Sequence, residues 1–475
     1  MSVKNDRDRW MRPEVDHGQG GEAGTILMVV PSVNDARRQE VPVELMIALP
    51  LAVPDEAALD LAELEERVQA WGQALMRQAL ATAWAAPAAL RPQPPCPACG
   101  GAVVRPAGSK PRKVETGFGP VWLRRPRVRC AGCGRYFQPD DAVLGPTLGA
   151  GRLSPRLTDL AALCGASWPY RQAAQVLSWL RGAPLAPETV RAVVAQVGQR
   201  VATTQARVAA AVCAPASRTN EPSRPVPPEI AVELDGAWVA AHDNPHGIEV
   251  KVGVVHTGSE AVGRTRRRLR QRRSAATTRG AGVFLPLMTA AIEHHNGFAA
   301  PKQTLLGDGA GWIWRFGDEA LPEADDILDR WHLRQARQRA LRAVLPDKEA
   351  RAPWRERLET VLEVGDVPGA LALLAELATQ TAAHPAVDDF AGYLTALAPR
   401  IPDYAARRAA GERIGSGAIE KGVDLVANRR LKGKRGMRWW RSRVEGVTAL
   451  RVTLLNNDWE RDVGPALTPH VLPAF

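Results

Sequence analysis

Apolar residues recur at helical spacing near the start of the chain. In residues 57 to 84, AALDLAELEERVQAWGQALMRQALATAW, they return every three or four positions, and the proline-rich RPQPPCP follows. This period is typical of an amphipathic helix, and proline ends helices. We therefore expect a region over residues 26 to 91 that contains one long helix. The polar, glycine-rich residues 1 to 25 have few apolar side chains to bury, so we expect them to be disordered.

Further along, the pattern alternates between strands and helices. The β-branched runs IAVELDGAWV and IEVKVGVV predict consecutive strands, and KQTLLGD and DDILD predict two more, with helices after the third and fourth. Such alternation favours a multidomain α/β protein with a mixed core. We place the first part of this core at residues 230–352, a wholly helical segment at 353–404, the C-terminal part of the core at 405–460 and a tail at 461–475.

Residues 150–212 predict a helical domain. The stretch YRQAAQVLSWLRGAPLAPETVRAVV predicts a helix, a turn through Gly182 and a second helix begun by Pro187. This layout is that of a helix-turn-helix, in which Arg191 would reach the major groove of DNA. Simple packing of two helices is the alternative. The segment over residues 213–229 is rich in proline and serine, which indicates a linker.

Composition and charge then narrow the class of partner. The chain has 475 residues, a net charge of +11 and a pI near 9.7, with arginine gathered in runs. This favours nucleic acid over a small neutral substrate. The longest apolar stretches fall short of the roughly 18 residues that a membrane span needs, and the N-terminus lacks the apolar core of a signal peptide. We expect a cytoplasmic, nucleoid-associated protein without a membrane partner.

Four cysteines form two Cys-x-x-Cys pairs, Cys96 with Cys99 and Cys130 with Cys133, and each pair is followed by glycine. Four thiolates suit tetrahedral zinc, and two short knuckles supply them. We therefore predict a zinc ribbon over residues 92–145 that holds structural Zn²⁺. Two coincidental pairs in a reduced protein are the alternative, and a redox role is weaker still.

Three carboxylates carry the candidate chemistry. Asp235 and Asp308 each follow an apolar run, in AVELDG and QTLLGDG, and Glu420 follows a Gly-Ser-Gly turn in which Ser416 is the expected N-cap. Acids on separate elements with open coordination positions suit Mg²⁺ or Mn²⁺. Two such ions can serve in-line displacement at phosphorus. Taken singly, each Asp-Gly motif is as readily explained as an ordinary turn.

Two basic runs predict contacts with DNA phosphates. Residues 425–444 contain eight Lys or Arg, no acid and the pair Trp439-Trp440, of which at least one is expected in the core; residues 264–273 contain seven arginines. A solvated, merely solubilising surface is the alternative. With the helix-turn-helix, the expected DNA contacts are Arg191, Arg264, Arg266, Arg267, Arg268, Arg429, Arg430, Lys432, Lys434, Arg435, Arg438 and Trp439.

The motifs LDGAWV, GDGAGWIW, ILDRWH and GSGAIE with RRLKGKRGMRW resemble bacterial insertion-sequence transposases of the ISKra type over about residues 92–456. That group is similar to the wider DDE transposases. The resemblance implies an RNase H-like core in which residues 353–404 are a helical insertion, and a catalytic triad of Asp235, Asp308 and Glu420. It also brings in Asp329 and His332, which match an Asp-x-x-His element and are catalytic candidates. A strand end followed by a capped helix explains these two equally well.

The sequence thus predicts a DDE transposase that binds double-stranded DNA at element ends, cleaves it with two Mg²⁺ or Mn²⁺ ions and joins it to a target. Because such reactions pair two ends, a homodimer or larger assembly is expected. A stand-alone RNase H-like nuclease is the enzymatic alternative, although it would need no end-binding module. A transposase-derived DNA-binding regulator is the non-enzymatic alternative, and the intact acids argue against it.

Overall fold

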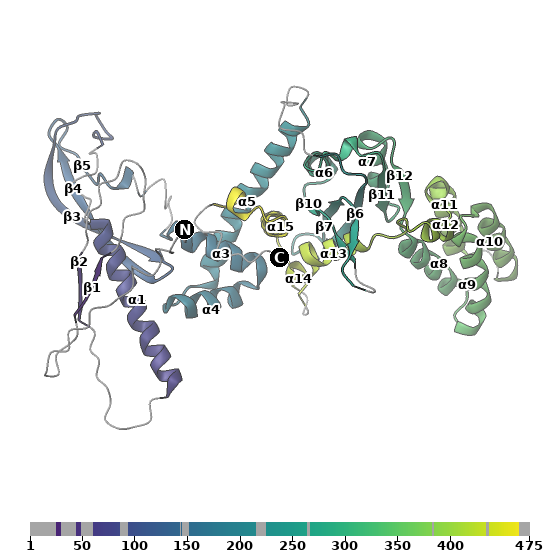
Figure 1. Ribbon diagram of the computed structural model, residues 1–475, viewed down its shortest axis with the longest axis horizontal. Helices are drawn as coiled ribbons and strands as arrows, with labels where there is room; N and C mark the ends of the chain where they lie inside the picture. The colour runs from purple at the N-terminus through teal and green to yellow at the C-terminus, as the bar shows by residue number, and fades with distance from the viewer. Residues whose placement is uncertain are drawn as a thin grey trace, which may run out of the picture. The chain divides into compact units, whose positions relative to one another are not determined.

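A computed structural model describes residues 25–29, 44–48, 60–85, 94–142, 144, 152–214, 225–263, 267–381, 384–433 and 437–464 (Figure 1). The predicted tails over residues 1–25 and 461–475 lie outside these ranges, except for Thr25 and residues 461–464. The chain divides into two compact units. Unit 1 comprises Met1–Gly165 and Tyr170–Val190, and unit 2 comprises Ala166–Pro169 and Arg191–Phe475.

Unit 1 is built around a three-stranded antiparallel sheet in the order β3 (Val104–Thr116), β4 (Gly119–Cys130) and β5 (Tyr136–Phe137). Buried and exposed residues alternate along β4, which is the pattern of a strand with one covered face. The covered face contributes Val114, Val121 and Leu123 to a small core, against which Trp84 packs. Trp84 lies on the long helix α1 (Leu61–Ala85).

The rest of unit 1 consists of a hairpin and helices. Strands β1 (Thr25–Val29) and β2 (Glu44–Ala48) pair antiparallel. After the sheet come α3 (Pro155–Ser167), α4 (Tyr170–Arg181) and the long α5 (Pro187–Val212), which continues into unit 2. The buried Arg181 guanidinium donates to the backbone carbonyls of Thr116 and Pro184 and pairs with Glu115, which fastens the end of α4 to β3.

Unit 2 is centred on a five-stranded mixed sheet in the order β10-β7-β6-β11-β12. Strand β6 pairs antiparallel with β7, and β7 pairs antiparallel with β10, whereas β11 runs parallel to β6 and to β12. The strand bounds are Ile230–Val239 for β6, Ile248–His256 for β7, Arg273–Thr277 for β10, Gln303–Gly307 for β11 and Asp325–Leu328 for β12. The short β8 (Ser259–Ala261) and β9 (Arg267–Leu269) form a hairpin between β7 and β10.

Helices cover both faces of this sheet. On one face, Val232 and Leu234 of β6 share a core with Phe284 and Met288 of α6 (Ala281–Glu293). Two further helices, α7 (Gly311–Ala320) and α8 (Arg330–Val344), follow β11 and β12. On the other face, α13 (Gly417–Val423) packs on β6 and β7. The strand order places the parallel strands β6, β11 and β12 next to one another, with β11 in the middle.

A helical segment interrupts the unit between α8 and α13. It comprises α9 (Lys348–Glu363), α10 (Val367–Thr381), α11 (Pro385–Leu397) and α12 (Tyr404–Ala409). After α13, a π-helical turn (Asp424–Asn428) and α14 (Arg429–Leu431) lead to α15 (Arg441–Leu455) and α16 (Trp459–Asp462). Helix α15 crosses α5 where a Cβ on Gly198 would lie 2.5 Å from the Gly446 carbonyl oxygen, so only glycine allows this approach.

The mixed α/β architecture is confirmed, and the strands predicted for IAVELDGAWV, IEVKVGVV, KQTLLGD and DDILD are present. The long helix starts at Leu61 instead of residue 57, and the helical segment starts at Lys348, five residues before the predicted position. The compact units divide inside the predicted helical domain over residues 150–212, and not at the predicted linker, part of which lies outside the described ranges. Among the described helices, none is long and apolar enough to cross a membrane.

Candidate functional site

Three side chains converge at the carboxyl ends of the parallel strands. Asp235 lies within β6, Asp308 directly follows β11, and His332 lies in the first turn of α8, which follows β12. One ligand atom from each residue lies within 4.8 Å of the other two, and all three residues are partly buried. The carboxyl ends of neighbouring parallel strands lie at the same edge of a sheet, and this topology brings together residues that are far apart in the sequence.

The turn after β11 fixes the Asp308 carboxylate. Its Oδ1 accepts a hydrogen bond of 2.9 Å from the backbone amide of Ala310, and Gly309 between them has φ of +103°. The hydroxyl of Tyr393 on α11 donates to the backbone carbonyl of Asp308 at 3.1 Å. A Cβ on Gly309 would lie 3.0 Å from that hydroxyl. The helical segment therefore braces the loop that carries Asp308.

Burial and the neighbouring Asp308 carboxylate raise the pKa of Asp235 to about 6, even though the amide of Gly236 donates to its Oδ1 at 2.6 Å. Both causes oppose negative charge at this position. A divalent cation would relieve both, because it would replace lost hydration and neutralise two adjacent carboxylates. The donor set of two carboxylates and an imidazole therefore fits a divalent metal ion.

Asp329 orients His332 and joins it to the loop before α13. Its buried carboxylate caps α8 by accepting from the amide of His332 at 3.2 Å, and it accepts from His332 Nδ1 at 2.6 Å. Its other oxygen accepts from the amide of Ser416 at 3.0 Å. Burial lowers the pKa of His332, but the hydrogen bond to Asp329 and the charges of Asp329, Asp308 and Asp235 together outweigh burial, so the net pKa is raised. The bond at Nδ1 leaves Nε2 as the ring atom available to a ligand.

Glu420 is not among the three converging residues. It lies in the first turn of α13, as predicted, and is exposed. The start of α13 is fastened to β6 by the fully buried Glu233, whose Oε2 accepts from the amides of Ala418 and Ile419 at 3.0 and 2.9 Å. Because side chains alternate along a strand, Glu233 and Asp235 share the face of β6 on which α13 packs.

The predicted role of Ser416 needs correction. Ser416 occupies the N-cap of α13, but its hydroxyl makes no side-chain cap, and the buried Oγ has no hydrogen-bond partner among the described residues. Glu233 supplies the acceptor in its place. Sequence reasoning missed Glu233, although a glutamate inside the apolar run IAVELDG was a usable signal, since buried carboxylates need partners.

The four paired cysteines also converge, with their sulfur atoms all within 4.8 Å of one another. The Sγ atoms of Cys96 and Cys133 are 3.7 Å apart, and those of Cys99 and Cys130 are 3.6 Å apart. Backbone hydrogen bonding, first from Cys133, lowers the pKa of Cys130 to about 7. A cluster of four sulfurs with one thiol close to ionisation at neutral pH can hold a metal ion such as zinc.

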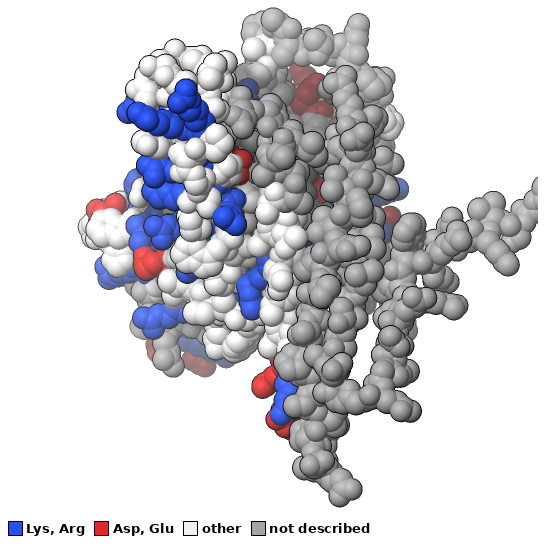
Figure 2. Space-filling model, turned by 90° about the vertical axis from the view of Figure 1, so that its left-hand side faces the viewer, with Lys and Arg blue, Asp and Glu red and all other residues white. Residues whose placement is uncertain are grey.

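The sheet next to this cluster has a basic face that was not predicted. Arg124, Arg127 and Arg129 alternate with buried residues along β4 and are exposed. In Figure 2, Lys and Arg side chains gather on the described part of the visible face. The guanidinium of Arg127 lies 4.3 Å from the ring centroid of Tyr136. The signal was the cluster of arginines in WLRRPRVRC, of which Arg127 and Arg129 keep the two-residue period of a strand.

Two of the predicted DNA contacts are withdrawn because their side chains are buried. Arg430 is 2% exposed and stacks over Trp439 at 5.0 Å, and Trp439 is 5% exposed and donates from Nε1 to the carbonyl of Leu431. Trp439 also pairs with the chain after β6, because its amide donates to Ala240 and its carbonyl accepts from His242. The basic C-terminal run is thus attached to the strand of Asp235.

The other predicted contacts are distributed as follows. Arg429, Lys432 and Arg438 are exposed, Arg268 is exposed and pairs with Glu260, and Arg191 is partly buried on α5. The side chain of Arg267 and the residues Arg264, Arg266, Lys434 and Arg435 lie outside the described part of the structure. Arg429 pairs with Asp424 at 2.9 Å, so it would exchange this partner for phosphate.

Comparison with known proteins identifies one family. The model of an uncharacterised protein family (UPF0236) matches residues 106–459, which include the three converging residues, Glu233 and Glu420. Among curated proteins, none matches the chain.

Proposed function

The chain belongs to the uncharacterised protein family UPF0236, and we propose that it is a metal-dependent DNA transposase of the DDE type. The observation that carries the proposal is the convergence of Asp235, Asp308 and His332 within 4.8 Å. The strand order β10-β7-β6-β11-β12, with β6 central, is that expected of an RNase H-like core. This supports the fold that the sequence resemblance implied.

In the proposed reaction, Asp235 and Asp308 hold Mg²⁺ or Mn²⁺. The metal would lower the pKa of water or a 3′-hydroxyl and would stabilise the charge that develops at phosphorus. The residues of the chain supply position and charge. Asp308 is held by its turn and by Tyr393, while Asp235 gains an ionised state that burial otherwise opposes.

His332 and Glu420 are the two candidates for the third group at the site. Because Asp329 occupies Nδ1 of His332, the other ring nitrogen, Nε2, can bind the cation or hold a proton beside it. Glu420 stays the predicted third carboxylate, because Glu233 holds α13 against the Asp235 face of β6. A second ion would need Glu420, since carboxylates suit Mg²⁺ better than imidazole does.

We further propose that unit 1 binds the ends of the DNA element. The four-cysteine cluster would hold structural zinc, the exposed arginines of β4 would contact phosphates, and Arg191, the first residue of the unit 2 part of α5, would reach the major groove. Helices α4 and α5 follow one another with a turn at Gly182, whose φ is +58°, as a helix-turn-helix requires. Two copies of the chain would act on two ends.

The test is cleavage of DNA that carries the sequences flanking the gene, in Mg²⁺ or Mn²⁺. Wild type should release a 3′-hydroxyl at the element end, and Asp308→Asn should lower the rate by at least about a hundredfold, as loss of a group acting in the transition state does. Asp318→Asn, on the exposed part of α7, is the matched control. A regulator without catalytic activity would bind these ends and leave them intact.

The same cleavage assay distinguishes His332 from Glu420 as the third group at the site. If Glu420 binds a second ion, Glu420→Gln should abolish cleavage with either metal. If His332 completes the site, His332→Ala should abolish cleavage, and Glu420→Gln should retain it. Cleavage at any sequence without preference for the flanking ends would instead indicate a nuclease.

A further inference from the structure

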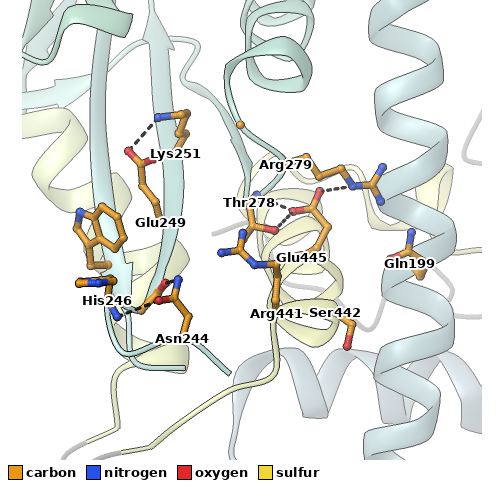
Figure 3. A pocket seen from close by; sticks show the side chains of 13 residues that line it. Gln199, Asn244, His246, Glu249, Lys251, Thr278, Arg279, Arg441, Ser442 and Glu445 are labelled. Atoms are coloured by element: carbon orange, nitrogen blue, oxygen red, sulfur yellow. Dashed lines mark hydrogen bonds and ion pairs between the residues drawn. The ribbon is translucent and has the colours of Figure 1, made fainter. Parts of the chain in front are cut away.

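A polar cavity of about 820 Å³ lies in unit 2 beside the exposed end of the β6–β7 pair. Its walls come from β6, β7, the turn between β10 and α6, the start of α15 and one residue of α5, Gln199. Figure 3 shows Glu249 and Lys251 on one side and Arg441 and Glu445 on another. This volume lies within the range of cavities that hold small organic ligands.

The cavity has a positive balance because its acids already have partners. Glu249 pairs with Lys251 at 2.9 Å, and Glu445 pairs with Arg279 at 3.3 Å. Glu445 also accepts from the hydroxyl of Thr278 at 2.8 Å. In contrast, Arg441 is exposed and has no carboxylate within ion-pair distance among the described residues. The cavity therefore favours an anionic ligand.

The start of α15 adds a second feature that favours an anion. Arg441 and Ser442 are the first residues of this 15-residue helix, and both line the cavity. The side chain of Trp440 at the N-cap offers no oxygen, and no side chain among the described residues caps the helix. The amide of Arg443 donates to the Trp440 carbonyl at 2.9 Å, whereas the amides of Arg441 and Ser442 have no hydrogen-bond acceptor among the described residues and suit a phosphate oxygen.

An exposed indole supplies the apolar part of the cavity. Trp238 is 56% exposed although it lies in the central strand, and its register partner is Glu249. A flat aromatic surface beside phosphate-binding groups is the combination that binds single-stranded nucleic acid. Trp238 lies three residues after Asp235 on β6, and because side chains alternate along a strand, its indole lies on the opposite face of the sheet from the Asp235 carboxylate.

We propose that this cavity binds one unstacked nucleotide of a single DNA strand. Its base stacks on Trp238, and its phosphate lies at Arg441 and the first turn of α15. The inference rests on the proposed function, since it takes the strand to be the substrate of the Asp235 site. It gives the cavity a role that the metal site does not require, namely to hold the end of the strand in an unpaired state.

The test measures binding of a single-stranded trinucleotide with 2-aminopurine at its centre to the full chain in the presence of EDTA. Stacking on Trp238 should quench the fluorescence of 2-aminopurine. Trp238→Ala should remove the quenching and weaken binding about tenfold, and Arg441→Gln should weaken binding to a similar extent. Trp168→Ala, which removes an indole 44% exposed outside the cavity and outside helices α4 and α5, should change neither.

Equal affinity and quenching in wild type and Trp238→Ala would overturn the inference, as would failure of the wild type to bind. Because Trp238 is exposed, an unchanged melting temperature should show that the variant is folded. The assay contains no divalent metal, so it is independent of cleavage. A pocket-dependent signal without cleavage in Mn²⁺ would contradict the proposed function and leave this inference in place.

Discussion

The carboxylate of Asp235 lies where burial and Asp308 both oppose its negative charge, so its pKa of about 6 lies above the value of about 3.9 expected in the unfolded chain. A group with a raised acidic pKa destabilises the fold once it ionises. The cost is absent below pH 4, appears as pH rises to 6 and is complete above that. By linkage it amounts to at most about 3 kcal/mol.

In metal-free protein, Asp235→Asn should therefore stabilise unit 2 at pH 7.5 by about 1–3 kcal/mol and have no effect at pH 4. Asparagine Oδ1 keeps the hydrogen bond from Gly236, so the change is confined to charge. Thermal denaturation in EDTA at both pH values measures the difference. A variant that is less stable than wild type at pH 7.5 would contradict the raised pKa.

A second prediction concerns the effect of Asp329 on the pKa of His332. Asp329→Asn should lower the pKa of His332, because the hydrogen bond to Nδ1 and the adjacent charge favour the protonated ring. NMR titration of the His332 ring protons measures this pKa directly. A purely structural role for Asp329 would leave that pKa unchanged, because the asparagine oxygen can still accept from the His332 amide and cap the helix.

Sequence patterns located Asp235 and Asp308, because apolar strands that end in Asp-Gly have a recognisable composition. They could not locate the partners of these residues. Tyr393 is 85 residues from Asp308, and Glu233 meets Ala418 and Ile419 across more than 180 residues. Such contacts depend on which strands become neighbours, and hydrophobic periodicity carries no information about that order.

At the scale of elements, the short helix α13 is stabilised mainly by hydrogen bonds from its N-terminal amides to Glu233. It has 7 residues, which is too short for a helix that is stable by itself. Glu233 satisfies two of its free amides, and Gly422 allows contact with β7, where a Cβ would lie 2.7 Å from Val254 Cγ2. The position of Glu420 therefore depends on a residue of β6.

Glu233→Gln should loosen α13, because an amide group cannot accept from Ala418 and Ile419 and also meet His256 as the carboxylate does. A loss of about 2 kcal/mol corresponds to hydrogen exchange some thirtyfold faster across Gly417–Val423. Glu445→Gln is the control, since its buried contacts lie at Thr277 and Thr278. Unchanged exchange in α13 would contradict the proposed anchor.

Strands and helices of unit 2 were predictable because each is long or strongly patterned. The order of the strands was not, since β10 returns beside β7 only after the β8–β9 hairpin. The burial of Arg430 escaped the sequence pattern, although Trp439, on which it stacks, belongs to a pair of which one was expected in the core. A run of basic residues predicts an exposed surface, but the bridge between Ala241 and Trp439 turns these two side chains inward.

At the scale of the whole molecule, each of the two units contains a cluster of side chains that could hold a metal ion, and the two clusters differ in their ligand atoms. Sulfur ligands suit zinc, and carboxylates suit Mg²⁺ or Mn²⁺. The small core of the β3–β5 sheet contains few buried apolar residues, which include Val114, Val121 and Leu123. A sheet with so small a core depends on a metal ion more than the five-stranded sheet of unit 2 does.

The purified chain should therefore contain zinc, which a strong chelator removes. Hydrogen exchange should then increase across β3 and β4 and stay unchanged across β6 and β11. Cys130→Ser should reproduce this effect, and Cys164→Ser, at a cysteine outside the cluster, should not. Metal analysis with hydrogen exchange measures both. Full protection of β3 and β4 in zinc-free protein would show that the cysteines do not stabilise the sheet.

The central claim is that Asp235, Asp308 and His332 bind a divalent metal ion. Electron paramagnetic resonance of Mn²⁺ added to the full chain tests it most directly. The account predicts that wild type binds Mn²⁺, that Asp308→Asn weakens binding by at least about tenfold, and that Asp318→Asn does not. Equal Mn²⁺ affinity in wild type and Asp308→Asn would contradict the claim.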